Sequence, residues 1–234
     1  MSNCSRTLDD VRTLIQSKDR SSSEQTMKFY DKWAETYQQD VEMIQYKAPK
    51  MVVNLLNANF TGSHEEALVL DVACGSGLVA KLMSELGFRH FVGVDCSEAM
   101  LKEADKTGLY RELKQALLGT DKLPAQNDMF DVVMIVGALL ETYVPVSVVR
   151  ELCHAAKPGG YVCMSSVDHE TVSGHEYTMS LEREMKLMEG EGLWTPVDTK
   201  EMDKWLMDPF SGDENKQNEK YLSGTMYLYR KSVI

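Results

Sequence analysis

Short apolar segments alternate with amphipathic helical patterns from residue 67 onward, and this alternation restricts the fold more than any other feature. Residues 67–72 predict a buried strand, and residues 79–86 then repeat apolar side chains at helical spacing. Further strands are predicted at residues 91–94, 113–118, 130–140 and 161–167. Helical patterns over residues 97–104 and 145–157 lie between them. Strands that alternate with helices favour a parallel sheet with right-handed crossovers.

The beginning of the chain departs from this pattern. Residues 1–22 are polar with two weakly apolar turns, and we expect them to form a flexible arm, with a short helix as the alternative. Ser21 and Glu24 have the spacing of a capping box, which predicts that a helix starts there. Pro49 is expected to interrupt this helical region, and a further helix is expected over residues 51–56.

The last third of the chain predicts another arrangement of strands. A charged helix is expected over residues 181–191, followed by strand-like segments at residues 194–205 and 221–231. The polar loop at residues 208–220 is too short for a packed crossover helix, so we expect an antiparallel hairpin at a sheet edge. The complete pattern predicts a doubly wound α/β fold around a mostly parallel, seven-stranded sheet.

The charge balance argues against some classes of partner. The chain has 234 residues, with 25 Lys and Arg against 36 Asp and Glu, which gives a formal net charge of −11. Nucleic-acid binding needs clustered basic side chains, and the chain has no basic run, so we expect no nucleic-acid partner. We also expect no membrane partner, because no apolar run approaches the roughly 20 residues of a membrane span. No His, Cys and Asp residues have metal-ligand spacing, so no metal is expected.

The cysteines indicate the compartment. There are five, an odd number without a Cys-x-x-Cys pair, which is typical of reduced thiols rather than a disulfide framework. We therefore expect a cytoplasmic protein, with the nucleus as an alternative, and a monomer. The polar first 20 residues show no signal-peptide core.

The loop after the first predicted strand is the strongest functional signal. This strand ends near Asp71 and passes through Gly75 and Gly77 into a helix, which brings backbone N–H groups close to a ligand. Asp95 ends the next strand, 18 residues after Gly77, where an acid can accept hydrogen bonds from both hydroxyls of a ribose. Both strand ends lie at the carboxyl edge of the sheet, so the sequence predicts a nucleoside site there.

Two kinds of nucleoside remain open at this point. Gly75, Gly77 and Ala80 satisfy the dinucleotide fingerprint, which would make the chain an NAD-dependent oxidoreductase. Asp71 favours another ligand, because an acid four residues before Gly75 would sit poorly beside a pyrophosphate. It could instead reach the amino group of an amino-acid moiety.

Four segments in order resemble the motifs of class I S-adenosylmethionine-dependent methyltransferases. Asp71, Gly75 and Gly77 occupy the positions of the first motif. The other three segments are residues 92–101, residues 130–133, and residues 152–161 with their Lys-Pro-Gly-Gly sequence. Each motif alone is weak, but the combination over roughly residues 65–168 is specific. Residues 29–37 also resemble the lid helix of members that act on small molecules.

The resemblance implies a division of the chain and a function. It implies a methyltransferase domain over residues 23–234, with a cofactor core at about 65–168 and acceptor-pocket elements at about 168–215. The cofactor would be S-adenosylmethionine and the product S-adenosylhomocysteine. The methyl acceptor would be a small-molecule or protein nucleophile. A protein that binds the cofactor without catalysis is a second alternative.

The resemblance also implies a set of cofactor-binding residues. These are Trp33, Tyr37, Asp71, Val72, Ala73, Gly75, Gly77, Asp95, Cys96, Met100, Gly119, Thr120, Gly137 and Ala138. Many relatives have an acid where this chain has Gly119, and Thr120 or Asp121 is the alternative adenine contact. Trp33 and Tyr37 have an equal alternative as plain core residues, and Met100 can fill the core as well. For Cys96, apolar packing is favoured over a reactive thiol.

No catalytic residue is predicted. The sulfonium already activates the methyl group, and a general base is needed only for an acceptor that is protonated at neutral pH. If the reaction uses a base, the candidates are the residues on loops after the fourth and fifth strands, namely Glu141, Tyr143, His169 and Glu170.

Overall fold

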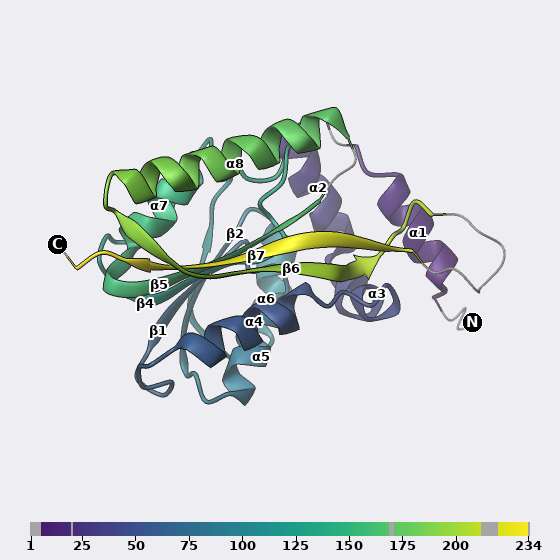
Figure 1. Ribbon diagram of the computed structural model, residues 1–234. Helices are drawn as coiled ribbons and strands as arrows, with labels where there is room; N and C mark the ends of the chain where they lie inside the picture. The colour runs from purple at the N-terminus through teal and green to yellow at the C-terminus, as the bar shows by residue number, and fades with distance from the viewer. Residues whose placement is uncertain (1–5, 20, 169–170, 212–219, 234) are drawn as a thin grey trace.

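The computed structural model describes residues 6–19, 21–168, 171–211 and 220–233. Within them, one seven-stranded sheet has the strand order β3-β2-β1-β4-β5-β7-β6 (Figure 1). The strands are β1 Leu68–Val72, β2 His90–Asp95, β3 Tyr110–Gln115, β4 Phe130–Ile135, β5 Ala156–Val167, β6 Trp194–Met207 and β7 Tyr221–Lys231. Strands β1 to β5 pair in parallel, whereas β7 runs antiparallel to both β5 and β6. The predicted fold and the edge hairpin are therefore confirmed.

Helices cover both faces of this sheet. They are α1 Leu8–Gln16, α2 Ser23–Trp33, α3 Tyr37–Met43, α4 Ala48–Asn59, α5 Leu78–Glu85, α6 Glu98–Asp105, α7 Val148–Ala155 and α8 Val172–Gly190, with a 3-10 turn η1 at Ala34–Thr36. Figure 1 shows α7 and α8 along one face, and α4 and α5 along the other. Helices α1, α2 and α3 gather at one end of the molecule, beside the ends of β6 and β7 (Figure 1).

The core has one layer on each side of the sheet. Leu70 and Val72 of β1 point into the layer under α7 and α8, where Leu152 and Met185 pack. Val69 points the other way, into the layer that α4 and α5 cover. Strand β1 is thus buried on both faces, which explains why a central parallel strand reads as a continuous apolar run.

Several helix boundaries differ from the sequence expectations. The N-cap of α2 is Ser22, not Ser21, because the Ser22 hydroxyl accepts a hydrogen bond from the Gln25 N–H at 3.2 Å. Pro49 does not interrupt a helix but lies in the first turn of α4, where its missing N–H costs nothing. The last helix, α8, begins at Val172, well before the expected residue 181, with the Thr171 hydroxyl as its cap.

Strand boundaries differ for reasons of pairing. Strand β4 ends at Ile135, because the chain turns at Gly137 with a positive φ of 74°. Strand β5 begins at Ala156 rather than at residue 161, and it includes Lys157 to Gly160. A register shift between β4 and β5 accommodates these extra residues. Strand β3 covers Tyr110–Gln115 rather than residues 113–118, because it forms along β2 on an edge with little apolar signal.

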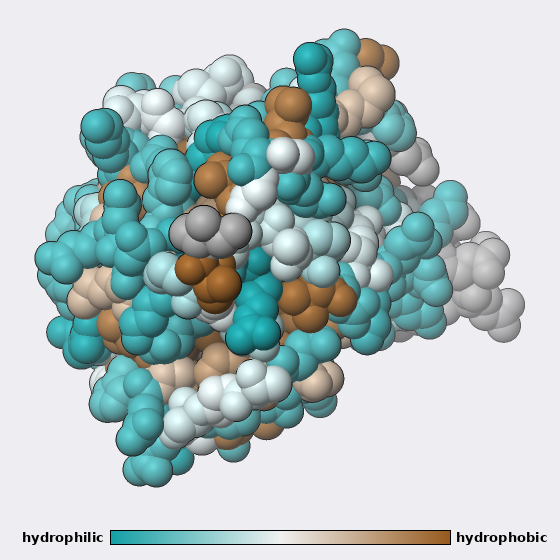
Figure 2. All heavy atoms as spheres, turned by 60° about the vertical axis from the view of Figure 1, so that its left-hand side comes forward, coloured by the Kyte–Doolittle hydropathy of each residue, from teal (hydrophilic) through white to brown (hydrophobic). Residues whose placement is uncertain are grey.

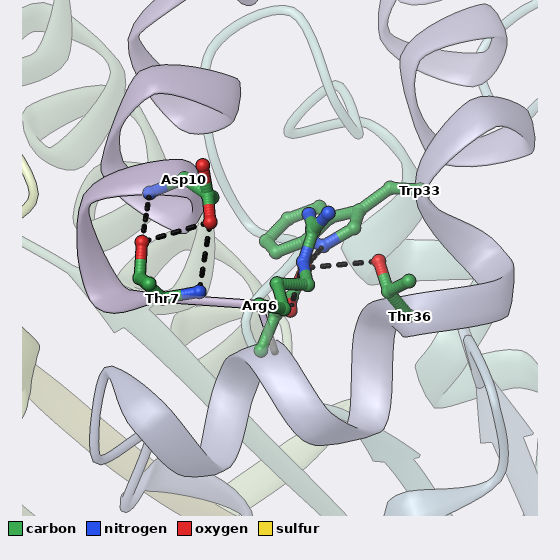
Figure 3. Close-up of polar contacts among 6 residues, drawn as sticks. Arg6, Thr7, Asp10, Trp33 and Thr36 are labelled. Atoms are coloured by element: carbon green, nitrogen blue, oxygen red, sulfur yellow. Dashed lines mark hydrogen bonds and ion pairs between the residues drawn. The ribbon is translucent and has the colours of Figure 1, made fainter. Parts of the chain in front are cut away.

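Helix α1 lies within the segment expected as an arm. Thr7 and Asp10 form a reciprocal capping box, and Val11 is fully buried. The Arg6 guanidinium donates to both carboxylate oxygens of Asp40, at 2.5 and 2.7 Å. Figure 3 shows the Trp33 indole and the Thr36 hydroxyl converging on the same place, and both also donate to Asp40. We call this group the Asp40 cluster; it ties the start of α1 to α2 and α3.

The surface is mostly polar. Figure 2 shows one face on which hydrophilic side chains predominate and hydrophobic ones form small, separated patches. None of the helices in the described residues combines the length and apolar content needed to cross a membrane.

Candidate cofactor and acceptor site

The loop between β1 and α5 has the tight geometry that its glycines permit. Ala73, Gly75 and Gly77 have positive φ angles of 54°, 53° and 86°. A Cβ at Gly77 would lie 3.1 Å from the Tyr110 ring, so this position favours glycine for space as well as for conformation. The Cys74 N–H donates to the Val94 carbonyl at 3.0 Å, which fixes the loop against the end of β2.

Asp95 is the acidic group at the wall of this loop. Its two oxygens accept hydrogen bonds from the backbone N–H groups of Gly75, at 2.8 Å, and Ser97, at 2.9 Å. Burial raises the pKa of Asp95, and the backbone donors oppose that rise. The donors include the backbone N–H and the side chain of Cys96 as well as the Gly75 and Ser97 N–H groups.

Asp71 lies behind the loop. It is only 1% exposed and accepts a hydrogen bond from the Tyr110 hydroxyl at 2.7 Å. Burial raises the pKa of Asp71 to about 7, and the nearby charge of Asp95 adds to this effect, whereas the Tyr110 bond opposes it. Asp71 therefore supports the loop from the protein interior and does not line the cavity.

A cavity opens against this loop, and we call it the glycine-loop cavity. It holds about 790 Å³ of non-atom space, including the part open to solvent. The expected site residues that line it are Tyr37, Ala73, Gly75, Asp95, Cys96, Met100, Gly137 and Ala138. The structure thus brings together eight side chains or backbone segments from five separate parts of the sequence.

The other expected residues lie elsewhere. Asp71, Val72 and Gly77 belong to the strand end and loop but are not among the lining residues. Gly119 and Thr120 line a neighbouring cavity, because the turn at Gly119 packs on Pro145. Leu117 lines the glycine-loop cavity in their place. An adenine contact of Gly119 or Thr120 stays a prediction.

A second cavity adjoins the first, and we call it the aromatic cavity. Its aromatic lining residues are Phe29, Tyr30, Trp33, Tyr37, Tyr46, Tyr143, Trp205 and Phe210. Trp33, expected at the cofactor, lies here. The two cavities share Tyr30, Tyr37, Tyr46, Gly137 and Tyr143 as a common wall. Part of the segment at residues 168–215 also lines it, as expected for acceptor elements, at Thr171, Trp205, Leu206, Pro209 and Phe210.

Tyr30, Tyr37 and Tyr46 of the common wall are half-buried and neutral. The Tyr30 and Tyr143 hydroxyls lie 3.3 Å apart. Burial raises the pKa of Tyr30, Tyr37 and Tyr46 above the ordinary value for tyrosine, and their mutual proximity adds to it. None of these three hydroxyls can therefore act as an anionic base near neutral pH.

Sequence reasoning missed some of these wall residues. Tyr30 had a signal, since it lies two helical turns before Tyr37 on the same face. Tyr46 had none, because it follows Gln45, whose positive φ of 53° turns the chain toward the cavity only in the folded protein. Glu141 and Tyr143, considered as bases, do line the aromatic cavity. His169 and Glu170 lie outside the described residues.

The remaining reactive groups are unsuited to chemistry here. Burial raises the pKa of Cys96 to about 12, and the pKa of Cys74 also lies above its usual value. These thiols therefore stay protonated and are poor nucleophiles. Across the part of the chain that the structure describes, no group of three or more His, Cys, Asp and Glu residues could hold a metal ion.

Comparison with known proteins identifies the family. Residues 69–160, which include the glycine loop and Asp95, match the model of a family described as "Methyltransferase domain". Human Methyltransferase-like protein 27 is 42% identical over 170 residues, an alignment that covers 73% of this chain and 68% of that protein. The chain belongs to the S-adenosylmethionine-dependent methyltransferase family. The resemblance noted from the four motifs is thereby confirmed.

Other members of the methyltransferase family are more distant. The ubiquinone biosynthesis O-methyltransferase of Bordetella bronchiseptica is 35% identical over 133 residues, which span 51% of this chain and 53% of that enzyme. The crystal structure of magnesium protoporphyrin IX methyltransferase from Synechocystis PCC 6803, with bound SAH, covers 95% of this chain and 100% of its own. Its TM-score is 0.61 at 17% identity, so this likeness concerns the fold alone.

Proposed function

We propose that the glycine-loop cavity binds S-adenosylmethionine and that the aromatic cavity receives the methyl acceptor. The observation that carries this proposal is the carboxylate of Asp95, which two backbone N–H groups hold at the cavity wall. An acid at the end of the second strand of such a unit suits the hydroxyls of a ribose. We propose as cofactor contacts the eight expected residues that line this cavity, with Leu117 added. Asp71, Val72 and Gly77 would support the loop, and cofactor contacts of Trp33, Gly119 and Thr120 stay predictions.

The lining of the glycine-loop cavity fits the cofactor. Met100, Leu117 and Ala138 provide an apolar surface of the kind that a purine ring needs. Gly75 has no heavy atom near the position of a Cβ, so a ligand can approach its backbone. The cofactor, when bound, supplies a methyl group that its sulfonium has already activated.

The protein's part in the reaction is then mainly positional. The common wall of tyrosines and Gly137 separates the two cavities, so groups on either side of it can be held at a short distance. The aromatic side chains exclude water from this junction. The acceptor is a small molecule or a protein side chain that offers its nucleophile at the aromatic cavity.

We further propose that residues 65–168 act as the cofactor core and that residues on both sides of it form the acceptor cavity. Cys74, Cys153 and Cys163 are buried free thiols. This usage supports a reducing compartment, the cytoplasm or the nucleus.

Isothermal titration with S-adenosylmethionine and S-adenosylhomocysteine tests the cofactor proposal. Asp95→Ala should weaken binding of either ligand by about 1 to 3 kcal/mol, because it removes charge-assisted hydrogen bonds. Asp105→Ala is the matched control, since Asp105 is an exposed acid at the end of α6. A folded sample that binds neither ligand would refute the proposal, and unchanged affinity in Asp95→Ala would remove Asp95 from the site.

A further inference from the structure

The aromatic cavity already contains a cation of the chain itself. Lys18 lines it, and its Nζ lies 3.4 Å from the centre of the Tyr143 ring. The same Nζ is 5.4 Å from the centre of the Tyr30 ring and 5.6 Å from that of Phe29. Lys18 is only 9% exposed, so this ammonium group has lost most of its contact with water. Three ring faces are thus turned toward one positively charged group.

This arrangement is a binding site for an ammonium group beside the common wall of the two cavities. An aromatic face attracts a cation within about 6 Å, and the attraction grows when the cation is desolvated. Tyr30 and Tyr143 line both the aromatic and the glycine-loop cavity. A cation on these rings therefore lies at the wall that separates the proposed acceptor from the proposed cofactor.

The charge balance of methyl transfer distinguishes the classes of acceptor. An acceptor that binds as an ammonium ion first releases one proton to water. The nitrogen lone pair of the resulting amine then forms the new N–C bond, while the S–C bond breaks and its electron pair stays on sulfur. The positive charge passes from sulfur to nitrogen, and any remaining N–H proton is released to water. With a phenolate, thiolate or carboxylate, the charge disappears from the products. Aromatic faces stabilise a cation throughout only in the first case.

We propose that the methyl acceptor is an amine and that the Lys18 side chain occupies the place of its ammonium group until the acceptor binds. This inference rests on the proposed function of the two cavities. Lys18 follows α1 and precedes α2, outside both helices, so its side chain can turn away without unwinding either. Glu141 also lines the cavity and is exposed, so it offers a carboxylate to an incoming cation.

The test measures binding of three probes of similar shape in the presence of saturating S-adenosylhomocysteine. The probes are phenethylammonium, neutral 2-phenylethanol and anionic 3-phenylpropanoate. We expect the Lys18→Met variant to bind phenethylammonium about tenfold more tightly than the wild type, because the Lys18 ammonium group no longer occupies the aromatic ring faces. Affinity for 2-phenylethanol should change less than about twofold. Lys28→Met is the matched control, because it removes the same charge from an exposed position of α2.

A second pair of variants keeps the test independent of Lys18. Tyr143→Phe keeps the ring face, whereas Tyr143→Leu removes it, so only the second should lose about five- to tenfold in affinity for phenethylammonium. Tighter binding of 3-phenylpropanoate, or equal binding of all three probes, would overturn the inference. Binding of S-adenosylhomocysteine itself, measured first in each sample, separates the two levels. If S-adenosylhomocysteine does not bind, the proposed function is refuted. If it binds but the protein shows no preference for the ammonium probe, only the proposal of an amine acceptor is refuted.

Discussion

At the scale of single residues, the buried acids of the glycine loop make stability depend on pH. The pKa of Asp71 is raised to about 7 in the folded protein, from an ordinary value of 3.8. The folded state therefore binds more protons at this site than the unfolded state between these two values. Stability from Asp71 is present below pH 4 or so and is lost as the pH rises toward about 7.

Asp71→Asn should remove this dependence. Relative to the wild type, the variant should become more stable as the pH rises from about 5 to about 8, because asparagine carries no proton to lose. Urea unfolding of both proteins at the two pH values measures the difference, and Asp95 is present in both. A stability difference that is the same at both pH values would contradict the assignment of the raised pKa to Asp71.

Gly137 offers a second residue-scale prediction. Its φ is 74°, and a Cβ there would lie 2.0 Å from the Tyr46 hydroxyl oxygen. Gly137→Ala should destabilise the protein by about 2 to 4 kcal/mol and displace Tyr46 from the common wall. Gly190→Ala is the matched control, because nothing lies near that Cβ, and it should change stability by about 1 kcal/mol or less. Denaturant unfolding that ranks the two variants equally would contradict this expectation.

At the scale of elements, the Asp40 cluster connects α1 to the helices that cover the site. Asp40 is fully buried and accepts hydrogen bonds from Arg6, Trp33 and Thr36. Arg6→Ala should cost about 1 to 3 kcal/mol, since it removes two charge-assisted bonds to a buried carboxylate. The exposed Arg111 on β3 supplies the control substitution to alanine.

Hydrogen exchange locates the effect of Arg6→Ala. Amides of α1 should exchange faster, while those of β1 and β4 keep their protection, because the core layers do not include Arg6. Equal loss of protection in α1 and in the central strands would show that the cluster supports the whole fold instead.

The elements were predictable where a local signal existed. The central strands follow from apolar runs in short windows, and the N-cap at Ser97 follows from a hydroxyl side chain directly before a helical pattern. The start of β5 was predicted at residue 161 rather than at Ala156, because the segment before residue 161 joins the strand only through a shift of the register between β4 and β5. Pairing of this kind depends on residues far apart in the chain, and no window of the sequence contains it.

At the scale of the whole molecule, a bound cofactor should raise the unfolding temperature. S-adenosylhomocysteine at a hundredfold excess over its Kd should add about 2.7 kcal/mol of stability. For a chain of this length that corresponds to a rise of about 5 to 10 °C. Thermal unfolding with S-adenosylhomocysteine and with NADH compares the two nucleoside alternatives directly. A rise with NADH alone would favour the oxidoreductase.

In the candidate site, too, residues with a local sequence signal were predicted, whereas residues that only packing brings together were not. Asp95 and the glycine loop were predicted from their spacing, and they do lie at one wall. Tyr46, Tyr143 and Trp205 were not predicted as neighbours, because only the packing of α3, the loop after β4, and β6 brings them to one cavity. The negative net charge led us to expect no nucleic-acid partner, but it gave no indication of the aromatic rings that surround the Lys18 ammonium group.

The lining residues of the two cavities are completed at different points of synthesis. Every residue that lines the glycine-loop cavity lies between Ser23 and Val144, whereas the aromatic cavity also needs Trp205 and Leu222. The segments synthesised last are therefore those that complete the acceptor side. Among the described residues, a growing chain therefore contains the whole lining of the glycine-loop cavity before that of the aromatic cavity.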